Sequence, residues 1–101
     1  MASTKDFRDF VLEQLRDLED ILCKGMMGEF LLYKGQILFG GVYDNRLLIK
    51  KTNSNKRYGL PEEIPYKNAK PMFMIEDIDD KDKLYQIIEE TCQDLIDNKK
   101  A

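Results

Sequence analysis

A chain of 101 residues with 43% hydrophobic side chains has the size and composition of one small folded domain, which excludes disorder over the whole chain. Charged residues make up 35% of the chain and the formal net charge is −3, which argues against a membrane-embedded protein and against the basic signature of nucleic-acid-binding domains. Histidine is absent, so the chain lacks the commonest general base and the commonest metal ligand.

The N-terminus does not have the basic-then-apolar leader of a signal peptide, and no apolar run approaches the roughly 20 residues that span a bilayer. Cys23 and Cys92 lie far apart in the sequence, so no Cys-x-x-Cys motif points to zinc or to redox chemistry. We therefore expect a cytoplasmic protein with two free thiols, because that compartment is reducing.

The first segment, residues 4–22, has the pattern of an amphipathic helix. Its apolar stripe consists of Phe7, Phe10, Val11, Leu15, Leu18 and Leu22, and charged residues occupy the opposite face. Ser3 or Thr4 is suited to cap the N-terminus, where the helix dipole favours the acidic Asp6.

Three segments rich in strand-forming residues follow, at 30–33, 36–43 and 46–50. Lys34-Gly35 and Asp44-Asn45 separate them and are typical of tight hairpin turns, since Gly, Asn and Asp tolerate positive φ. We predict a meander of three antiparallel strands. Gly40-Gly41 lies inside the second strand and indicates close backbone packing, with an approaching ligand as the alternative.

After residue 51 the chain becomes irregular, with turn-forming residues and three prolines, and a short helical turn is predicted near residues 56–60. Met72–Ile75 suits a fourth strand. A second helix follows Asp79-Asp80, with the stripe Leu84, Ile87, Ile88, Cys92, Leu95 and Ile96.

Strands grouped between two helices predict an α+β fold with two layers, in which an antiparallel sheet of about four strands packs against the N- and C-terminal helices. We expect both helices to lie on one face of the sheet. The predicted contact residues are Phe10, Leu15, Leu18, Ile87, Ile88 and Leu95.

Two segments have the residue types of a ligand site. Gly25-Met26-Met27-Gly28-Glu29 is either a phosphate-binding loop or, as we favour, a strand bend or bulge with buried methionines. The acidic residues Glu76, Asp77, Asp79, Asp80 and Asp82 are either ligands for Ca²⁺ or Mg²⁺ or, as we favour, acids at a helix N-terminus. The sequence thus predicts no catalytic, cofactor-binding or metal-binding residues.

The basic loop at residues 46–57 offers possible nucleic-acid contacts through Lys50, Lys51, Lys56 and Arg57. Tyr58 and Tyr66 nearby have rings that stack on bases. The overall negative charge favours the other interpretation, in which this loop faces the protein's own acidic helices.

Several short motifs gain meaning from their order and spacing. These are Phe10–Leu15, Lys24–Glu29, Leu32–Gly35, Gly40–Leu47 and Pro65–Met72. In this order they resemble the TfoX N-terminal domain family of bacteria, from Phe7 to Ile96. The resemblance implies one α+β domain over residues 1–101, often self-associating, from a family named for regulators of competence genes. It supplies no catalytic residues.

The leading hypothesis is a non-enzymatic regulatory or protein-interaction domain that forms a homodimer, since the edges of a small sheet invite pairing with another chain. Residues 46–51 are expected at a sheet edge, because charges stand at both ends of that strand, and Met72–Ile75 is expected to be central or protected. Two alternatives remain open: a weak nucleic-acid-binding module that uses residues 46–57, and a small-molecule-binding protein or enzyme without a recognisable site.

Overall fold

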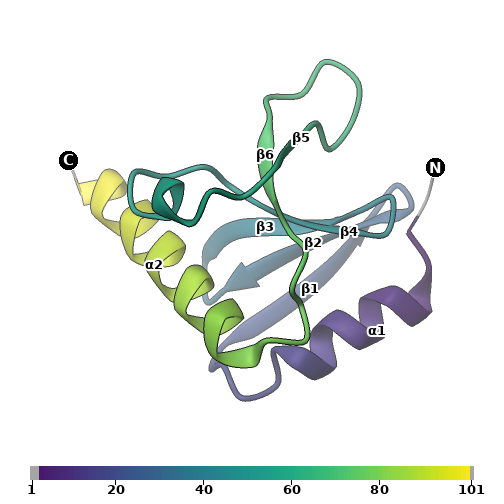
Figure 1. The fold of residues 1–101 in the computed structure, drawn as a ribbon. Coiled ribbons are helices and arrows are strands. Elements are labelled where there is room, and N and C mark those ends of the chain that lie inside the picture. Colours follow the sequence, from purple (N-terminus) through teal and green to yellow (C-terminus); the bar gives the residue numbers. More distant parts are fainter. Residues whose placement is uncertain (1–2, 101) are drawn as a thin grey trace.

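The computed structural model describes the backbone of residues 3–100 and the side chains of residues 3–97. Its elements are α1 (Lys5–Gln14), β1 (Ile21–Met26), β2 (Glu29–Lys34), β3 (Ile37–Tyr43), β4 (Arg46–Ile49), the 3-10 helix η1 (Asn55–Tyr58), β5 (Glu62–Glu63), β6 (Met72–Ile75) and α2 (Lys81–Lys100). Six strands of this described part form one antiparallel sheet in the order β1-β2-β3-β4-β6-β5. Both helices lie on the same side of the sheet (Figure 1).

This architecture confirms the predicted α+β class. The sheet has six strands instead of about four, because the prediction lacked β1 and β5. Tight turns build the β1–β4 meander. Met27 and Gly28 have φ of 52° and 86°, Gly35 has 63°, and Asp44 and Asn45 have 51° and 56°. Turns with positive φ match the twist of the strands that they join, which is why short polar or glycine-containing segments predicted two of the three hairpins.

The predicted first helix is wrong beyond Gln14. Thr4 caps it as expected, because its hydroxyl oxygen accepts a hydrogen bond from Phe7 N at 3.1 Å. Asp20 then adopts a φ of 64°, and its carbonyl accepts a hydrogen bond from Gly35 N at 2.7 Å, which sets the next residues beside β2. Residues 21–26, which include the last residue of the apolar stripe, pair with β2 and form strand β1. Leu22 is 52% exposed, so its predicted burial is also wrong.

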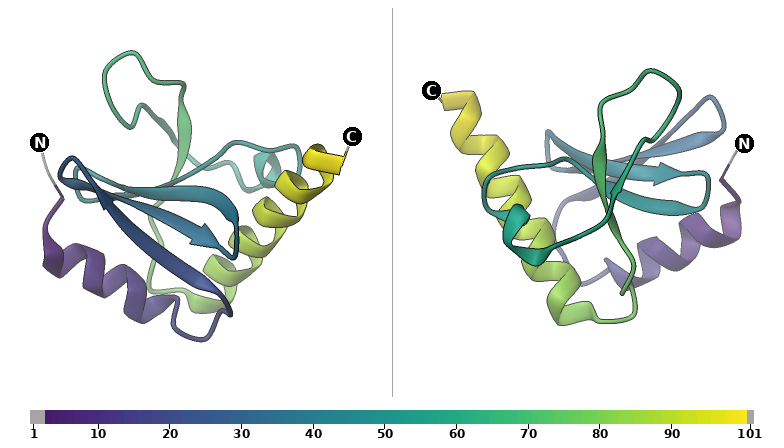
Figure 2. Two further views of the ribbon diagram at one scale, coloured as in Figure 1. Left: turned by 180° about the vertical axis from the view of Figure 1, so that it is seen from behind. Right: turned by 45° about the horizontal axis from the view of Figure 1, so that its top comes forward.

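The core lies between the helices and the inner face of the sheet (Figure 2). It contains Val11 and Leu15 from the first helical segment, Leu84, Ile87 and Ile88 from α2, and alternate strand residues such as Leu47, Ile49, Phe73 and Ile75. The predicted packing is confirmed for Leu15, Ile87 and Ile88, while Leu18 and Leu95 are half-buried at its margin. Phe10 is 41% exposed, so its predicted burial is wrong.

The sheet edges differ from those expected. Strand β4 lies between β3 and β6, so the edge position predicted for residues 46–51 is wrong, whereas β6 is internal as predicted. Close backbone packing is confirmed at Gly40 and Gly41, where a Cβ atom would lie 2.2 Å from Leu48 O and 2.5 Å from Phe30 O. No helix in the described residues is both long and apolar enough to cross a membrane.

Candidate functional site

The outer face of the sheet, away from the helices, is also largely apolar. Leu47 and Ile49 belong to the core on the inner face, and Leu48 between them is fully buried outside that cluster. Strand alternation therefore places Leu48 on the outer face. The loop of residues 64–71, which joins β5 to β6, stands on this side of the sheet (Figure 1).

A groove of about 620 Å³ lies between this loop and the outer face of the sheet, and we call it the outer groove. Its apolar lining includes Leu38 and Met72 from the sheet and Pro65, Ala69 and Pro71 from the loop. Ligand sites in proteins are typically concave and mostly apolar, with volumes of about 300–1,000 Å³. The outer groove has these properties.

Three lysines, Lys50, Lys51 and Lys70, line the outer groove, and no acidic residue does. Lys51 Nζ pairs with Glu62 at 2.8 Å and lies 5.4 Å from the centre of the Phe73 ring. Within the described part of the chain, the structure gives Lys50 and Lys70 no ion pair. Phe73 belongs to the core on the inner face of the sheet, so the Lys51 ammonium lies on that side, and Lys50 and Lys70 supply the positive charge of the groove.

Two tyrosines supply the aromatic surface of the groove. The rings of Tyr43 and Tyr66 are 6.1 Å apart and tilted by 50°. Tyr43 is buried, and burial raises the pKa of its phenol, with nearby Tyr66 adding to the effect. Tyr66 is 60% exposed, so much of its surface is open to solvent. The pair thus combines a fixed ring with an accessible one.

Arg46 holds the start of the loop against the sheet. Its guanidinium donates to Glu63 at 2.8 Å, to the Ile64 carbonyl at 3.3 Å and to the Tyr43 carbonyl at 3.1 Å. A turn within the loop is closed by the Ala69 N–H, which donates to the Tyr66 carbonyl at 3.0 Å. These contacts give the groove a wall with defined position.

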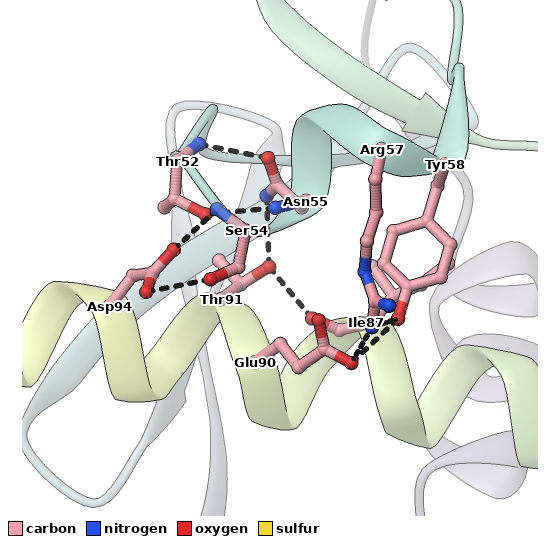
Figure 3. Close-up of polar contacts among 9 residues, drawn as sticks. All are labelled: Thr52, Ser54, Asn55, Arg57, Tyr58, Ile87, Glu90, Thr91 and Asp94. Carbon is pink, nitrogen blue, oxygen red and sulfur yellow. Dashed lines mark hydrogen bonds and ion pairs between the residues drawn. The ribbon is translucent and has the colours of Figure 1, made fainter.

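The structure separates the four basic residues that the sequence suggested as nucleic-acid contacts. Lys50 and Lys51 line the outer groove, whereas Lys56 and Arg57 belong to η1. Arg57 forms an ion pair with Glu90 of α2, to which Tyr58 donates a hydrogen bond at 2.7 Å (Figure 3). The second interpretation of this loop, in which it faces the acidic helix, therefore describes Arg57 and Tyr58.

Hydrogen bonds fix the same loop to α2 around Asn55, which is fully buried (Figure 3). The Asn55 side chain donates to the Lys50 carbonyl at 2.8 Å and to the Thr91 hydroxyl at 2.9 Å, and it accepts from Thr52 N at 2.9 Å. Every polar atom of the amide is used, so this cluster stabilises the fold and leaves no group for a ligand.

Two carboxylates of α2 face this loop. The Ser54 N–H and hydroxyl donate to Asp94 at 2.8 and 2.9 Å, and the backbone bond is the main cause of the lowered pKa of Asp94. The hydrogen bond from Tyr58 is the main cause of the lowered pKa of Glu90. Both carboxylates are therefore held in the charged form that their partners favour.

The other two segments considered as ligand sites have structural roles. Asp80 caps α2 by accepting from Lys83 N at 3.2 Å, and Asp77 pairs with Lys83 at 3.4 Å. Among the described residues, no three His, Cys, Asp or Glu side chains gather as a metal site. Met27 and Gly28 form the β1–β2 turn, and Met26 and Met27 are 47% and 96% exposed, so their predicted burial is wrong.

Strand β1 is a second exposed feature, because it pairs with β2 alone and forms one edge of the sheet. Residues that flank a two-residue turn form a hydrogen-bonded pair, here Met26 and Glu29, and such pairs alternate along the hairpin. The N–H and C=O groups of Ile21, Cys23 and Gly25 consequently point away from β2, towards the open edge.

Sequence reasoning missed the outer groove because its parts are far apart in the chain. The sequence shows that Lys50 and Lys51 are basic neighbours, but nothing in it connects them with Tyr66, Lys70 or Leu38. The usable signal was the pair of segments Pro65-Tyr66 and Lys70-Pro71-Met72, where prolines stiffen a loop that carries aromatic and basic side chains.

In comparisons with known proteins, no family model matches the chain. Over 80 residues the chain is 30% identical to the uncharacterized 12.7 kDa protein in the trpE 5′ region of Spirochaeta aurantia. This match covers 77% of the chain and 70% of the Spirochaeta protein. The resemblance to the TfoX N-terminal domain family stays a prediction.

Proposed function

Given that the chain belongs to the same family as the uncharacterized 12.7 kDa protein of Spirochaeta aurantia, we propose a function from its own geometry. The protein is a non-enzymatic, regulatory interaction domain of the cytoplasm, and it acts as a homodimer. The lack of histidine supports the non-enzymatic part, and the resemblance to competence-regulator domains supports the regulatory part.

The open edge of β1 is the observation that carries the proposal. An edge strand presents unpaired N–H and C=O groups, and proteins commonly protect such an edge with proline, charge, a bulge or a covering segment. Over its six residues β1 has a single charge, Lys24, and no proline, and the exposed Leu22 and Met26 lie on it. The other edge, β5, has only two residues.

Self-pairing of β1 satisfies this edge best when Cys23 faces Cys23 of a second copy. In that antiparallel register Ile21 pairs with Gly25, so all three outward-facing residues form hydrogen-bonded pairs. Lys24 then faces Leu22, and no two like charges lie directly opposite each other. The arrangement has two-fold symmetry, the commonest for two identical chains.

Two substitutions at Gly25 test this interface. Gly25→Pro removes an outward N–H and should convert the dimer to a monomer, since proline cannot donate to an added strand. Gly25→Ala is the matched control, because its Cβ would lie no closer than 3.8 Å to Phe30 and its N–H remains. Light scattering over a concentration series should give twice the 11.9 kDa chain mass for the wild type and for Gly25→Ala.

Oxidation tests the register. Opposed residues in a hydrogen-bonded pair have Cα atoms about 5.5 Å apart, within the range that a disulfide spans. Mild oxidation should therefore link two chains through Cys23, and Cys23→Ser should abolish the link while Cys92→Ser keeps it. A mass that stays at 11.9 kDa up to high concentration, with no Cys23 link, would refute the homodimer.

A further inference from the structure

We infer that the outer groove binds a small phosphate ester of a ring compound, of which a nucleoside monophosphate is the representative chemistry. The inference goes beyond the interaction role proposed above and rests on different residues. It uses the lysines, tyrosines and apolar side chains that the loop of residues 64–71 and the outer face of the sheet bring together.

The positive charge of the groove favours an anionic ligand. Lys50 and Lys70 line it without any acidic residue in the lining, and among the described residues neither has an ion-pair partner, whereas the Lys51 ammonium pairs with Glu62 beside the Phe73 ring. Two lysines without ion pairs in one groove attract an anion, and lysine acts as a point charge that suits phosphate. A phosphate monoester brings a charge of about −1.5 to −2 at neutral pH, which matches the two lysines without an ion pair.

The remaining lining sets the shape of the ligand. Leu38, Met72 and Pro65 form an apolar surface, and inorganic phosphate alone would leave this surface exposed to water. Tyr66 is 60% exposed beside the buried Tyr43, so its ring has a face available for stacking. A planar ring attached to the phosphate would cover the apolar lining and stack on Tyr66, and these gains are absent for inorganic phosphate.

The size of the groove favours a small molecule over a polymer. A volume of about 620 Å³ lies in the middle of the range of about 300–1,000 Å³ that small-molecule sites occupy. A nucleic-acid strand would need a longer basic track, yet Arg46, Lys51 and Arg57 are each paired with a glutamate.

Titrations of the full chain with AMP, adenosine and inorganic phosphate, followed by NMR chemical shifts and calorimetry, test the inference. AMP should bind saturably, and adenosine and phosphate should each bind at least about tenfold more weakly, because each lacks one of the two contributions. Shifts should be confined to the lining residues.

Variants locate the binding. Lys70→Glu and Lys50→Glu should each weaken AMP binding at least about tenfold, since a charge-assisted hydrogen bond is replaced by repulsion. Lys67→Glu is the matched control, because it lies in the same loop but outside the lining, and it should leave the affinity within about twofold. Tyr66→Ala should weaken binding on the order of tenfold, whereas Tyr66→Phe retains the stacking ring. Lys70 and Tyr66 are exposed, so their variants should fold.

Three results would overturn the inference. The first is the absence of saturable AMP binding at millimolar concentration. The second is equal affinity in Lys70→Glu and Lys67→Glu, which would remove the site from the groove. The third concerns the source of the phosphate: if a single-stranded oligonucleotide binds more tightly than AMP and Lys56→Glu abolishes that binding, the ligand is nucleic acid held outside the groove.

Discussion

Replacement of the buried Asn55 by alanine should destabilise the protein strongly. Asn55 is fully buried, and its side chain bonds to Thr52 N and the Lys50 carbonyl in its own loop and to the Thr91 hydroxyl of α2. Alanine leaves the Thr52 N–H and the Lys50 carbonyl without this partner. The Thr91 hydroxyl is less affected, because it still donates to the Ile87 carbonyl at 2.7 Å (Figure 3).

The magnitude follows from the two orphaned backbone groups. A buried polar group left without a partner costs about 1–3 kcal/mol. Two such groups give about 2–4 kcal/mol if water reaches the vacated space and relieves part of the cost. A domain of this size typically has about 5–15 kcal/mol of stability, so the loss is large but compatible with folding.

Urea unfolding followed by circular dichroism measures the change. The midpoint should fall with an unchanged slope, since the same surface is exposed on unfolding. Asn53→Ala is the control, because Asn53 lies in the same loop and is exposed, and it should change the stability by less than about 0.5 kcal/mol. Equal stabilities for Asn55→Ala and Asn53→Ala would refute the role assigned to this amide.

Three further predictions concern other parts of the chain. Gly40→Ala should cost about 1–3 kcal/mol or prevent folding in urea titrations, because its Cβ would lie 2.2 Å from Leu48 O, whereas Gly25→Ala should fold normally. Leu84→Ala should cost about 2–5 kcal/mol, and Phe10→Ala less than about 1 kcal/mol, since Leu84 is fully buried and Phe10 is 41% exposed. The Ser54 N–H is the main cause of the lowered pKa of Asp94 in the folded protein. The charged Asp94 therefore stabilises the fold above about pH 4, and this contribution is lost as the pH falls through the lowered pKa. In unfolding measurements from pH 7 to pH 2, the free energy of unfolding should fall less for Asp94→Asn than for the wild type.

Much of the fold follows from local rules that the sequence displays. The turns at Gly35 and at Asp44-Asn45 need positive φ, and those residue types adopt it readily. The apolar spacing of α2 and the strand-forming residues Met72–Ile75 likewise predict the elements that the structure has there. Prediction succeeded where local preference and tertiary packing agree.

The first helix shows where such rules fail. Leu18 and Leu22 continue the helical spacing of Phe7 and Val11, and periodicity alone predicts one long helix. Pairing with β2 wins for residues 21–26, because a β-strand there adds hydrogen bonds and lets Ile21 and Cys23 contact the core. Long-range pairing of this kind is not encoded in the spacing of apolar residues, so the end of a helix is a weak point of sequence reasoning.

The candidate site was still harder to foresee. The basic residues were grouped by their nearness in the sequence, at positions 50–57, but the structure groups Lys50 and Lys51 with Lys70 and turns Arg57 towards Glu90. Lys50 directly follows β4, which ends at Ile49, and Lys70 lies shortly before the start of β6 at Met72. Because β4 and β6 are neighbours in the sheet, the two lysines line the same groove. Proximity in space depends on strand order, and the order β4-β6-β5 is not apparent from the sequence.

The two proposed surfaces are compatible in one assembly. Strand β1 is one edge of the sheet, and strand β2 separates it from β3 and β6, which supply the sheet residues that line the outer groove. Antiparallel pairing of two β1 strands places the two-fold axis perpendicular to the sheet, so both copies keep their helices on one side and their loops of residues 64–71 on the other. The proposed dimer would then have one continuous sheet, in which strand β2 of each copy separates its groove from the shared edge. We therefore expect self-association through the edge to leave the groove open, so that a substitution that abolishes one proposed activity keeps the other.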